Sequence, residues 1–391
     1  MKIVVLGGSG EVGRAVTADL AGCRDIDEII VADISSDAAA FVALLDDDRV
    51  NAAIVDLNDT RAVLRTLEGA DVLMNCTSFT VFDRVLELAI EARVDYADLM
   101  SFPSTCQRKA VEGAGITAIS GLGSSPGLSN VLVRHSAEEF DEIEEVHISG
   151  VSWRAIARSQ GLLDTVLWEL AAENPKRRYF QNGRLRQAGF MEGSRTVEFA
   201  PPVGRHLVYL VPHPEPVTLP RHFPTLKFCA VRVGWQRELM EDIRVLNKYG
   251  LLQREVLAGA GEGQSAFDAT YSQIWRTFGG CSFEGICLLF THVEVIGQRN
   301  GTTYQRVYDL THPLDWGEAA TGRQTGICAS VGAQLLARHG RTTVGFVDPE
   351  VYYDPHEFIA ELKARGTLSL IARESVIERG SGCDRAMTTE P

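Results

Sequence analysis

Short apolar runs alternate with helix-like segments along the first third of the chain. The strand-like runs cover residues 1–6, 28–33, 51–57, 70–78, 95–99 and 115–120. The helix-like segments, with apolar positions spaced by three and four, cover residues 14–22, 58–69 and 82–94. A short helix is also expected after Pro103. Strands separated by helices predict right-handed parallel crossovers, and therefore an α/β domain with a doubly wound parallel sheet.

A different pattern covers residues 129–313. Residues 144–153 alternate like a strand, and residues 161–175 resemble a helix that ends at Asn174-Pro175. Further strand-like runs are 195–200, 205–211, 226–235, 283–298 and 302–312. Asn300-Gly301 predicts a type I′ hairpin between the last two. The five prolines within 212–224 predict an ordered, extended loop. The simplest architecture is an inserted α+β domain on a largely antiparallel sheet with helices on one face.

The turn after the first apolar run is rich in glycine. It reads GGSGEVG and joins a strand-like run to a helix-like segment. Glycines let the backbone approach a pyrophosphate, and the N–H groups at the start of a helix hold its charge. Gly8, Gly10 and Gly13 fit the G-x-G-x-x-G spacing, whereas Gly7, Gly10 and Gly13 fit a spacing one residue longer. Both alternatives predict a dinucleotide site.

Asp33 ends the second apolar run, about 20 residues after the last glycine. A carboxylate there accepts hydrogen bonds from both ribose hydroxyls and repels the 2′-phosphate of NADP. The next residues, Ile34, Ser35 and Ser36, offer no cation to neutralise that phosphate. NAD is therefore the expected cofactor. The contacts predicted around the turn are Gly7, Gly8, Ser9, Gly10, Glu11, Val12, Gly13, Asp33 and Ile34.

In a doubly wound sheet, ligands lie at the carboxyl ends of the strands. The residues selected on this ground are Asp56, Leu57, Asn75, Cys76, Thr77, Asp98 and residues 121–127, with Gly123 among the cofactor contacts. Asp98 is expected near the nicotinamide, where its carboxylate could hold or deprotonate a substrate ammonium. The alternative for Asp98 is a cap of the following loop, and the alternative for Asp56 is a charge at a helix N-terminus. Cys76 is interpreted as a packing residue rather than a nucleophile.

Composition narrows the functional classes. The chain of 391 residues, 45% of them hydrophobic, can fill the cores of two domains or a little more. A net charge of −14 makes nucleic acid an unfavourable partner. No run of 18 apolar residues and no signal sequence is present, which predicts no membrane association and a cytoplasmic location. The eight cysteines form no C-x-x-C pair, so no metal site is expected. The absence of a P-loop and of a Ser-His-Asp pattern disfavours phosphoryl transfer and hydrolysis.

Five segments together resemble the saccharopine dehydrogenase-like oxidoreductases, in particular the branch that includes lysine 6-dehydrogenase and carboxynorspermidine dehydrogenase. They are VVLGGSGEVGR, ADVLMNCTSF, VDYADL, SGLGSSPGLSNVL and, near the C-terminus, VGFVDPEVYYD. The similarity spans nearly the whole chain and is strongest before residue 132 and after residue 321. It implies reversible hydride transfer between a nicotinamide cofactor and the C–N bond of an amine or imine.

The resemblance also implies roles for single residues. Tyr96 and Asp98 match the family's Y-x-D beside the substrate, and Gly123, Pro126 and Gly127 match its G-x-x-P-G loop over the nicotinamide. Saccharopine reductase itself carries Cys-Gly-Gly-Leu-Pro in that loop. This chain departs from that pattern, which argues against saccharopine as the substrate.

An amino-acid substrate requires a cation for its carboxylate, a role that arginine performs bidentately. The candidates are Arg154, Arg158, Arg195, Arg221 and Arg232. Arg154 is favoured because it directly follows a strand-like run and Trp153, and Arg221 in the proline-rich loop comes next. The alternative for each is a solvated surface arginine.

The predicted domains are a Rossmann NAD-binding domain over 1–128 and a substrate-binding and dimerisation domain over 129–314. A C-terminal segment over 315–373 is expected to return to the Rossmann domain, followed by a flexible tail over 374–391. A homodimer is expected, and a monomer is the alternative. The predicted activity is NAD-dependent oxidation or reduction at a C–N bond of an amino acid or polyamine-type amine. A C=O or C=C reductase and a non-catalytic NAD sensor remain alternatives.

Overall fold

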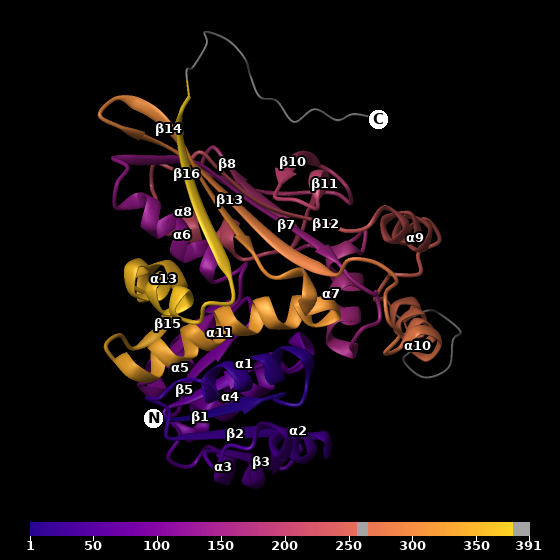
Figure 1. Ribbon diagram of the computed structural model, residues 1–391, viewed down its shortest axis with the longest axis vertical. Coiled ribbons are helices and arrows are strands. Elements are labelled where there is room, and N and C mark those ends of the chain that lie inside the picture. Colours follow the sequence, from indigo (N-terminus) through magenta and orange to yellow (C-terminus); the bar gives the residue numbers. More distant parts are fainter. Residues whose placement is uncertain (256–264, 378–391) are drawn as a thin grey trace. The chain divides into compact units, whose positions relative to one another are not determined.

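The computed structural model describes residues 1–255 and 265–377, and they form two compact units (Figure 1). The first unit contains residues 1–135 and 321–366, and the second contains residues 136–320 and the described residues from 367 onward. The divisions thus fall after residues 135, 320 and 366 instead of the expected 128, 314 and 373. In the part of the chain described, no helix combines the length and apolar character that crossing a bilayer requires.

The first unit is built on a seven-stranded sheet in the order β15-β6-β5-β4-β1-β2-β3, with every neighbouring pair parallel. The strands are β1 (Lys2–Leu6), β2 (Glu28–Asp33), β3 (Val50–Ile54), β4 (Val72–Asn75), β5 (Asp95–Asp98), β6 (Thr117–Ser120) and β15 (Gly345–Val347). The order 3-2-1-4-5-6 is that of a Rossmann sheet. The predicted doubly wound parallel sheet is therefore confirmed.

Helices connect these strands. They are α1 (Glu11–Ala21), α2 (Asp37–Leu45), α3 (Thr60–Leu67), η1 (Phe79–Val81), α4 (Phe82–Ala92), α5 (Thr105–Ala114), α6 (Leu128–Ala137), α11 (Ala320–His339), α12 (Pro349–Tyr352) and α13 (Pro355–Ala364). The helices α3 and α4 cover the segments predicted for them, and α5 is the helix expected after Pro103. The pattern assigned no element to α2. Buried strand and helix residues such as Val4, Leu73 and Leu88 form a continuous core.

The second unit is built on a nine-stranded sheet, in which seven strands follow the order β10-β11-β12-β7-β13-β14-β16, β8 pairs with β12, and β9 pairs with β8. Its strands are β7 (Glu142–Trp153), β8 (Arg178–Gln181), β9 (Arg184–Gln187), β10 (Arg195–Phe199), β11 (Gly204–Leu210), β12 (Phe228–Gly234), β13 (Leu288–Arg299), β14 (Thr302–Thr311) and β16 (Ser369–Val376). Only β12 and β7 pair in parallel among these described strands, so the largely antiparallel sheet is confirmed. Asn300 and Gly301 have φ values of 52° and 75°, as a type I′ turn requires.

The helices of the second unit include one that replaces the predicted extended loop over 212–224. They are α7 (Gln160–Leu170), α8 (Glu215–His222), α9 (Arg237–Lys248), α10 (Ala266–Phe278) and η2 (Leu314–Ala319). Pro214 and Pro216 lie at the start of α8, where a helix needs no N–H donor. The expectation of an extended chain was wrong for residues 215–222: prolines at the start of a helix are compatible with it, and Pro220 is accommodated inside this short helix.

The C-terminal segment also differs from its prediction. Residues 369–376 were divided between the Rossmann domain and a flexible tail, but they form β16 and pair with β14 along its length. Most side chains of β16 are exposed, so the segment has no burial pattern that would indicate a strand from sequence. The rest of the predicted tail, residues 378–391, lies outside the described residues.

Candidate cofactor-binding and active site

The glycine-rich turn joins β1 to α1. Gly7 has a φ of 74°, and a Cβ atom there would lie 2.8 Å from the carbonyl carbon of Cys76. A Cβ atom at Gly13 would lie 2.2 Å from the carbonyl oxygen of Gly7. At Gly10, by contrast, the only close atom is that same oxygen, at 3.2 Å. Gly7 thus takes the role of the first glycine in the tight turn, and Gly10 leaves space for a pyrophosphate at the start of α1.

The carboxylate of Asp33 lies at the end of β2 and is held by the backbone. Its Oδ2 accepts the N–H of Ser9 at 2.9 Å, and its Oδ1 accepts the N–H of Ser35 at 3.0 Å. Each carboxylate oxygen has a further lone pair, so Asp33 is oriented and still able to accept ribose hydroxyls. Ile34 beside it is exposed. Glu11 and Val12 begin α1.

Arg14 also supports this turn, although it was not among the residues predicted from the sequence. Its Nε donates to the carbonyl oxygen of Ser9 at 2.6 Å, and its guanidinium lies 4.9 Å from the centre of the Phe41 ring. Ser9 is therefore held from both sides, by Arg14 through its carbonyl and by Asp33 through its N–H. The signal for this role was its position, directly after Gly13 on the first turns of α1.

The residues that follow β4 form the next part of this strand edge. The side-chain oxygen of Asn75 accepts the N–H of Thr77 at 3.0 Å and its hydroxyl at 2.7 Å. The side-chain nitrogen of Asn75 donates to the Tyr96 hydroxyl at 3.0 Å. Burial raises the pKa of the Cys76 thiol far above its usual range, which disfavours the thiolate form that a nucleophile requires.

Asp98 ends β5 and is completely buried. Its Oδ1 accepts the Ser120 hydroxyl at 3.0 Å and the Gly121 N–H at 3.2 Å. Its Oδ2 has no hydrogen-bond partner among the described residues. Burial raises the pKa of Asp98 to about 6, although the polar groups around it, those of Ser101, Ser120, Gly121 and Tyr96, act in the opposite direction. Asp98 therefore caps the following loop through one oxygen and leaves the other available.

The hydroxyl of Ser120 is fixed in turn by Ser101. It accepts the Ser101 N–H at 2.8 Å and lies 2.8 Å from the Ser101 hydroxyl. Tyr96 lies on the same strand as Asp98, and burial together with the charge of Asp98 raises the pKa of its phenol well above the usual range. Tyr96 therefore stays protonated at any physiological pH.

The loop over residues 121–127 returns on itself after β6. Gly121 and Gly127 have φ values of 86° and 114°, and a Cβ atom at Gly127 would lie 2.6 Å from the Gly123 nitrogen. The peptide bond between Ser125 and Pro126 is cis. The glycine conformations and the bridge between Gly123 and Gly127 bring these backbone segments into one compact turn beside the end of β6.

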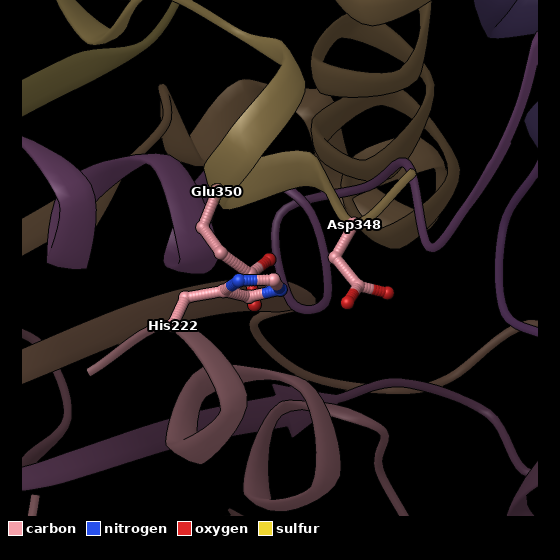
Figure 2. A group of neighbouring side chains, drawn as sticks. All are labelled: His222, Asp348 and Glu350. Atoms are coloured by element: carbon pink, nitrogen blue, oxygen red, sulfur yellow. The ribbon is translucent and has the colours of Figure 1, made fainter. Parts of the chain in front are cut away.

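Asn130 and Glu350 support this loop. The Asn130 side-chain oxygen accepts the Gly127 N–H at 3.0 Å, and its side-chain nitrogen donates to Glu350 at 2.9 Å. Figure 2 shows Glu350 and Asp348 on the segment that begins α12. Glu350 is almost completely buried. It belongs to the VGFVDPEVYYD segment, for which the sequence analysis gave no residue role.

Since β2, β1, β4, β5 and β6 are neighbours in the sheet, their carboxyl ends form a row. That row brings together the residues predicted at the strand ends, from Asp33 through Asn75 to Asp98. Asp56 lies after β3 and is bonded locally: its Oδ1 accepts the N–H and the side-chain amide of Asn58. Leu57 is partly buried against the core of this unit. The cap of α3 is Asp59 and not Asp56.

The two arginines predicted for the substrate both belong to the second unit. Arg154 is buried, and its terminal nitrogens donate to the carbonyl oxygens of Ala155 and Leu162, each at 3.1 Å. Those bonds fix the chain after β7. Arg221 lies in the last turn of α8 and is exposed.

Comparison with known proteins agrees with this geometry. Residues 3–142 match the family model of the saccharopine dehydrogenase NADP binding domain. The chain is 23% identical over 389 residues to carboxyaminopropylagmatine dehydrogenase of Synechocystis sp., covering 94% of this chain and 96% of that protein. It is also 23% identical over 231 residues to carboxynorspermidine synthase of Vibrio alginolyticus, covering 54% of each.

Solved structures show the same fold. Apo saccharopine dehydrogenase (L-Glu forming) from Saccharomyces cerevisiae superposes with a TM-score of 0.67 at 15% identity, covering 96% of this chain and all of that one. The homospermidine synthase of Legionella pneumophila, solved with NAD, gives a TM-score of 0.62 at 14% identity, covering 96% and 91%. The predicted nicotinamide dinucleotide cofactor is confirmed as a class. The predicted resemblance to the saccharopine dehydrogenase-like family is likewise confirmed, and it rests on the match of residues 3–142 and on the full-length similarity to the Synechocystis dehydrogenase.

Proposed function

We propose that this chain is an NAD-dependent oxidoreductase that transfers hydride to or from a carbon bonded to nitrogen, in an amino acid or a polyamine-type amine. The observation that carries the proposal is the buried carboxyl of Asp98, whose Oδ2 has no partner in the described structure. It ends a strand between Asn75 and the loop over residues 121–127. The amine class is supported by the names of two relatives, which act on carboxylated polyamines or make them.

The residues at the first strand ends fit a dinucleotide. The turn around Gly10 and the start of α1 would hold the pyrophosphate, and Asp33 would accept the ribose hydroxyls. Asn75, Thr77 and the loop with Gly123 would line the rest of the cofactor. The bound cofactor supplies the hydride acceptor or donor. The carboxylate of Asp33 favours NAD over NADP because it would repel a 2′-phosphate.

Oxidation of an amine removes a hydride from carbon and a proton from nitrogen. In this proposal Asp98 receives that proton on Oδ2, while Ser120 and the Gly121 N–H hold Oδ1 in place. With a pKa raised by burial to about 6, Asp98 is ionised at neutral pH and remains basic enough to accept a proton. In the reverse direction the protonated carboxyl returns the proton to the imine nitrogen. Tyr96, Pro126, Arg154 and Arg221 remain candidates for contact with the substrate.

The test is turnover with chemically distinct substrates. Amino acids and polyamines are offered with NAD, and mixtures of amines with keto acids or aldehydes are offered with NADH, with simple ketones and enones as controls. We expect consumption of NADH only where an imine can form, with a secondary amine as the product identified by mass. Turnover of ketones or enones without an amine would indicate the alternative reductase. Cofactor binding without any turnover would indicate an NAD sensor.

A homodimer in the cytoplasm is part of the same proposal. The nine-stranded sheet of the second unit ends at β16, whose side chains are mostly exposed. An edge strand of this length is a surface that proteins commonly cover. This exposed edge supports the predicted homodimer, while the location remains a prediction from composition.

A further inference from the structure

One face of the second sheet carries charged and polar side chains that are buried. Arg232 of β12 pairs in register with Ser149 of β7, and Ser149 pairs with His292 of β13. Two residues along β7, His147 pairs with Glu294. Residues directly opposite each other on neighbouring strands point to the same face, as do residues two apart on one strand. All five side chains therefore share one face.

Two polar side chains on this face have partners. The Oε2 atom of Glu294 accepts Arg195 Nη2 at 2.8 Å, and His292 Nδ1 lies 2.8 Å from Asp309 Oδ1. Glu294 nevertheless keeps its other oxygen, Oε1, without a hydrogen bond although the residue is only 3% exposed. One acceptor on this face is therefore unsatisfied.

Arg232 is the unpaired cation of the face. It is 3% exposed, its Nε donates to the Gly193 carbonyl at 2.7 Å, and its Nη1 has no partner. Within residues 1–255 and 265–377, it forms no ion pair. Burial lowers the pKa of Arg232 to about 10, so the group is still charged at neutral pH. Glu294 on the same face attracts Arg232 and Arg195 repels it, but Glu294 is already paired with Arg195, so Arg232 has no ion-pair partner of its own among the described residues. A buried guanidinium left in this state is costly, which favours an anion at this site.

Arg232 leans along its strand toward His147. Its guanidinium lies 5.9 Å from the ring centre of Phe228, and that ring centre lies 4.9 Å from the ring centre of His147. Between Phe228 and Arg232, the same face of β12 carries only the methyl group of Ala230, which pairs with His147. Because Ala230 has a short side chain, no bulky side chain of β12 lies on this face between Phe228 and Arg232.

Two further buried atoms near Arg232 have no partner. The Ser149 hydroxyl is fully buried and makes no hydrogen bond, and the same holds for Nδ1 of His147. The other ring nitrogen of His147 lies 3.2 Å from Glu145. Burial lowers the pKa of His147, so the ring is neutral; with its proton directed at Glu145, Nδ1 is an acceptor.

The unsatisfied atoms thus form two pairs of opposite kind. Arg232 and Ser149, whose backbones pair in one register row, carry the donors Nη1 and the hydroxyl, and Glu294 and His147, which pair in the next row, carry the acceptors Oε1 and Nδ1. The Arg232 side chain extends from its own row toward this second row. Donors of this type bind a carboxylate, and such acceptors bind an ammonium group. We propose that this face of the second sheet is a binding site for an α-amino acid zwitterion. Its carboxylate meets Arg232 and Ser149, and its ammonium group meets Glu294 and His147.

The proposal does not depend on the proposed oxidoreductase activity, because binding is measured without turnover. Isothermal titration calorimetry on the full chain, without cofactor, uses L-alanine as the probe, with acetate and ethylamine as the two halves of the zwitterion. We expect L-alanine to bind at least about tenfold more tightly than either half, since each half leaves two buried groups unsatisfied. No L-alanine binding at millimolar concentrations, or equal binding of acetate, overturns the proposal.

Matched variants locate the site. Ser149→Ala removes one hydroxyl with little change in packing and should weaken L-alanine binding about tenfold. Arg232→Met should abolish it. Arg205→Met, which removes an exposed cation from the neighbouring strand β11, should leave it unchanged. Thermal melts establish whether each variant folds. If Arg232→Met does not fold, the test rests on Ser149→Ala. Wild-type affinity in Ser149→Ala and in a folded Arg232 variant would refute the site.

Enzyme kinetics with added L-alanine distinguish a zwitterion that is part of the substrate from a free amino acid that regulates the protein. If the zwitterion is part of the substrate, L-alanine should raise the KM for the amine substrate and leave kcat unchanged. If it is a free amino acid that regulates the protein, L-alanine should change kcat without competition. Either effect of L-alanine supports the site if it is present in the wild type and absent in Ser149→Ala. An effect of L-alanine that persists in Ser149→Ala contradicts it.

Discussion

At the scale of single residues, the two carboxylate oxygens of Asp98 have different roles. Oδ1 caps Gly121 and accepts Ser120, whereas Oδ2 is unpartnered. Asp98→Asn keeps an oxygen for the two donors and removes only the ability to accept a proton. We expect NAD affinity to stay nearly unchanged and turnover of the amine to fall by about 100-fold or more.

The same preparation must be melted thermally, because a purely structural Asp98 predicts another result. In that case the melting temperature drops, and the remaining activity follows the folded fraction. Normal turnover per folded molecule would remove Asp98 from the mechanism and direct attention to Arg154 and the loop over residues 121–127.

The pH dependence of oxidation should report on the same carboxyl. Only ionised Asp98 can accept a proton, and its pKa, raised by burial, is about 6. We therefore expect kcat/KM for amine oxidation to decrease about tenfold per pH unit below about 6 and to level off above it. Ser120→Ala removes a hydrogen bond that favours the ionised form, so it should move this limb to higher pH. An unshifted limb in a folded Ser120→Ala variant would show that another group titrates.

Asp33 is the residue expected to set cofactor preference. If its carboxylate accepts the ribose hydroxyls as proposed, it repels a 2′-phosphate, so NAD should be preferred over NADP by at least about tenfold, or about 1.4 kcal/mol. Comparison of kcat/KM for the two cofactors measures this preference. Asp33→Asn keeps an acceptor for the Ser9 N–H and removes the charge, so it should narrow the difference. Equal efficiencies in the wild type would contradict the assignment.

At the scale of the elements, variants in the turn between β1 and α1 distinguish a loss of cofactor binding from a loss of folding. Gly10 has a φ of −71°, which any residue adopts, and the only atom close to its Cβ position is the Gly7 carbonyl oxygen at 3.2 Å, which a small backbone adjustment can relieve. Gly10→Val should therefore fold normally and lose NAD binding, because the side chain occupies the space for the pyrophosphate. Gly13→Ala is the contrast: its Cβ atom would lie 2.2 Å from the Gly7 oxygen, so the fold itself should be destabilised. Calorimetric NAD affinity near the wild-type value in Gly10→Val would mean that the turn is misassigned.

Most elements of the first unit were predictable because a parallel sheet buries both faces of its strands, which produces continuous apolar runs. The strands β1, β2 and β4 and the helices α3 and α4 follow this rule or the helical period. Elements outside these patterns were missed. The helix α2 buries only Ala38 and Phe41, so no apolar stripe distinguishes it from a loop.

The candidate site was also predictable only in part. The strand ends follow from the sheet topology, so Asp33, Asn75 and Asp98 could be placed from sequence. The support by Arg14 and Glu350 could not, because each contact depends on tertiary packing. The β16 strand illustrates the same limit, since β14, and not its own side chains, determines its pairing.

At the scale of the whole molecule, the predicted cofactor contacts lie in one of two compact units. Unit one holds residues 1–135 and 321–366, and it contains the glycine turn, Asp33 and Asp98. A ligand stabilises only the structure that binds it, by about 2.7 kcal/mol when its concentration is 100 times the Kd. Saturating NAD should therefore slow amide hydrogen exchange in this unit, in peptides from β1 through α1 and at the ends of β4 and β5. Peptides from β13 and β14 in the second unit should change much less.

Gly10→Val is the control for this measurement, because it should remove the protection while leaving the exchange of the free protein unchanged. The comparison also tests the assignment of the C-terminal segment. Residues 321–366 belong to the first unit, so peptides from α11 should gain protection with those of β1, although they are more than 300 residues apart in sequence. Equal slowing of exchange in both units would mean that NAD binding stabilises the two cores together. Protection confined to the second unit would place the dinucleotide outside the Rossmann sheet and contradict the site.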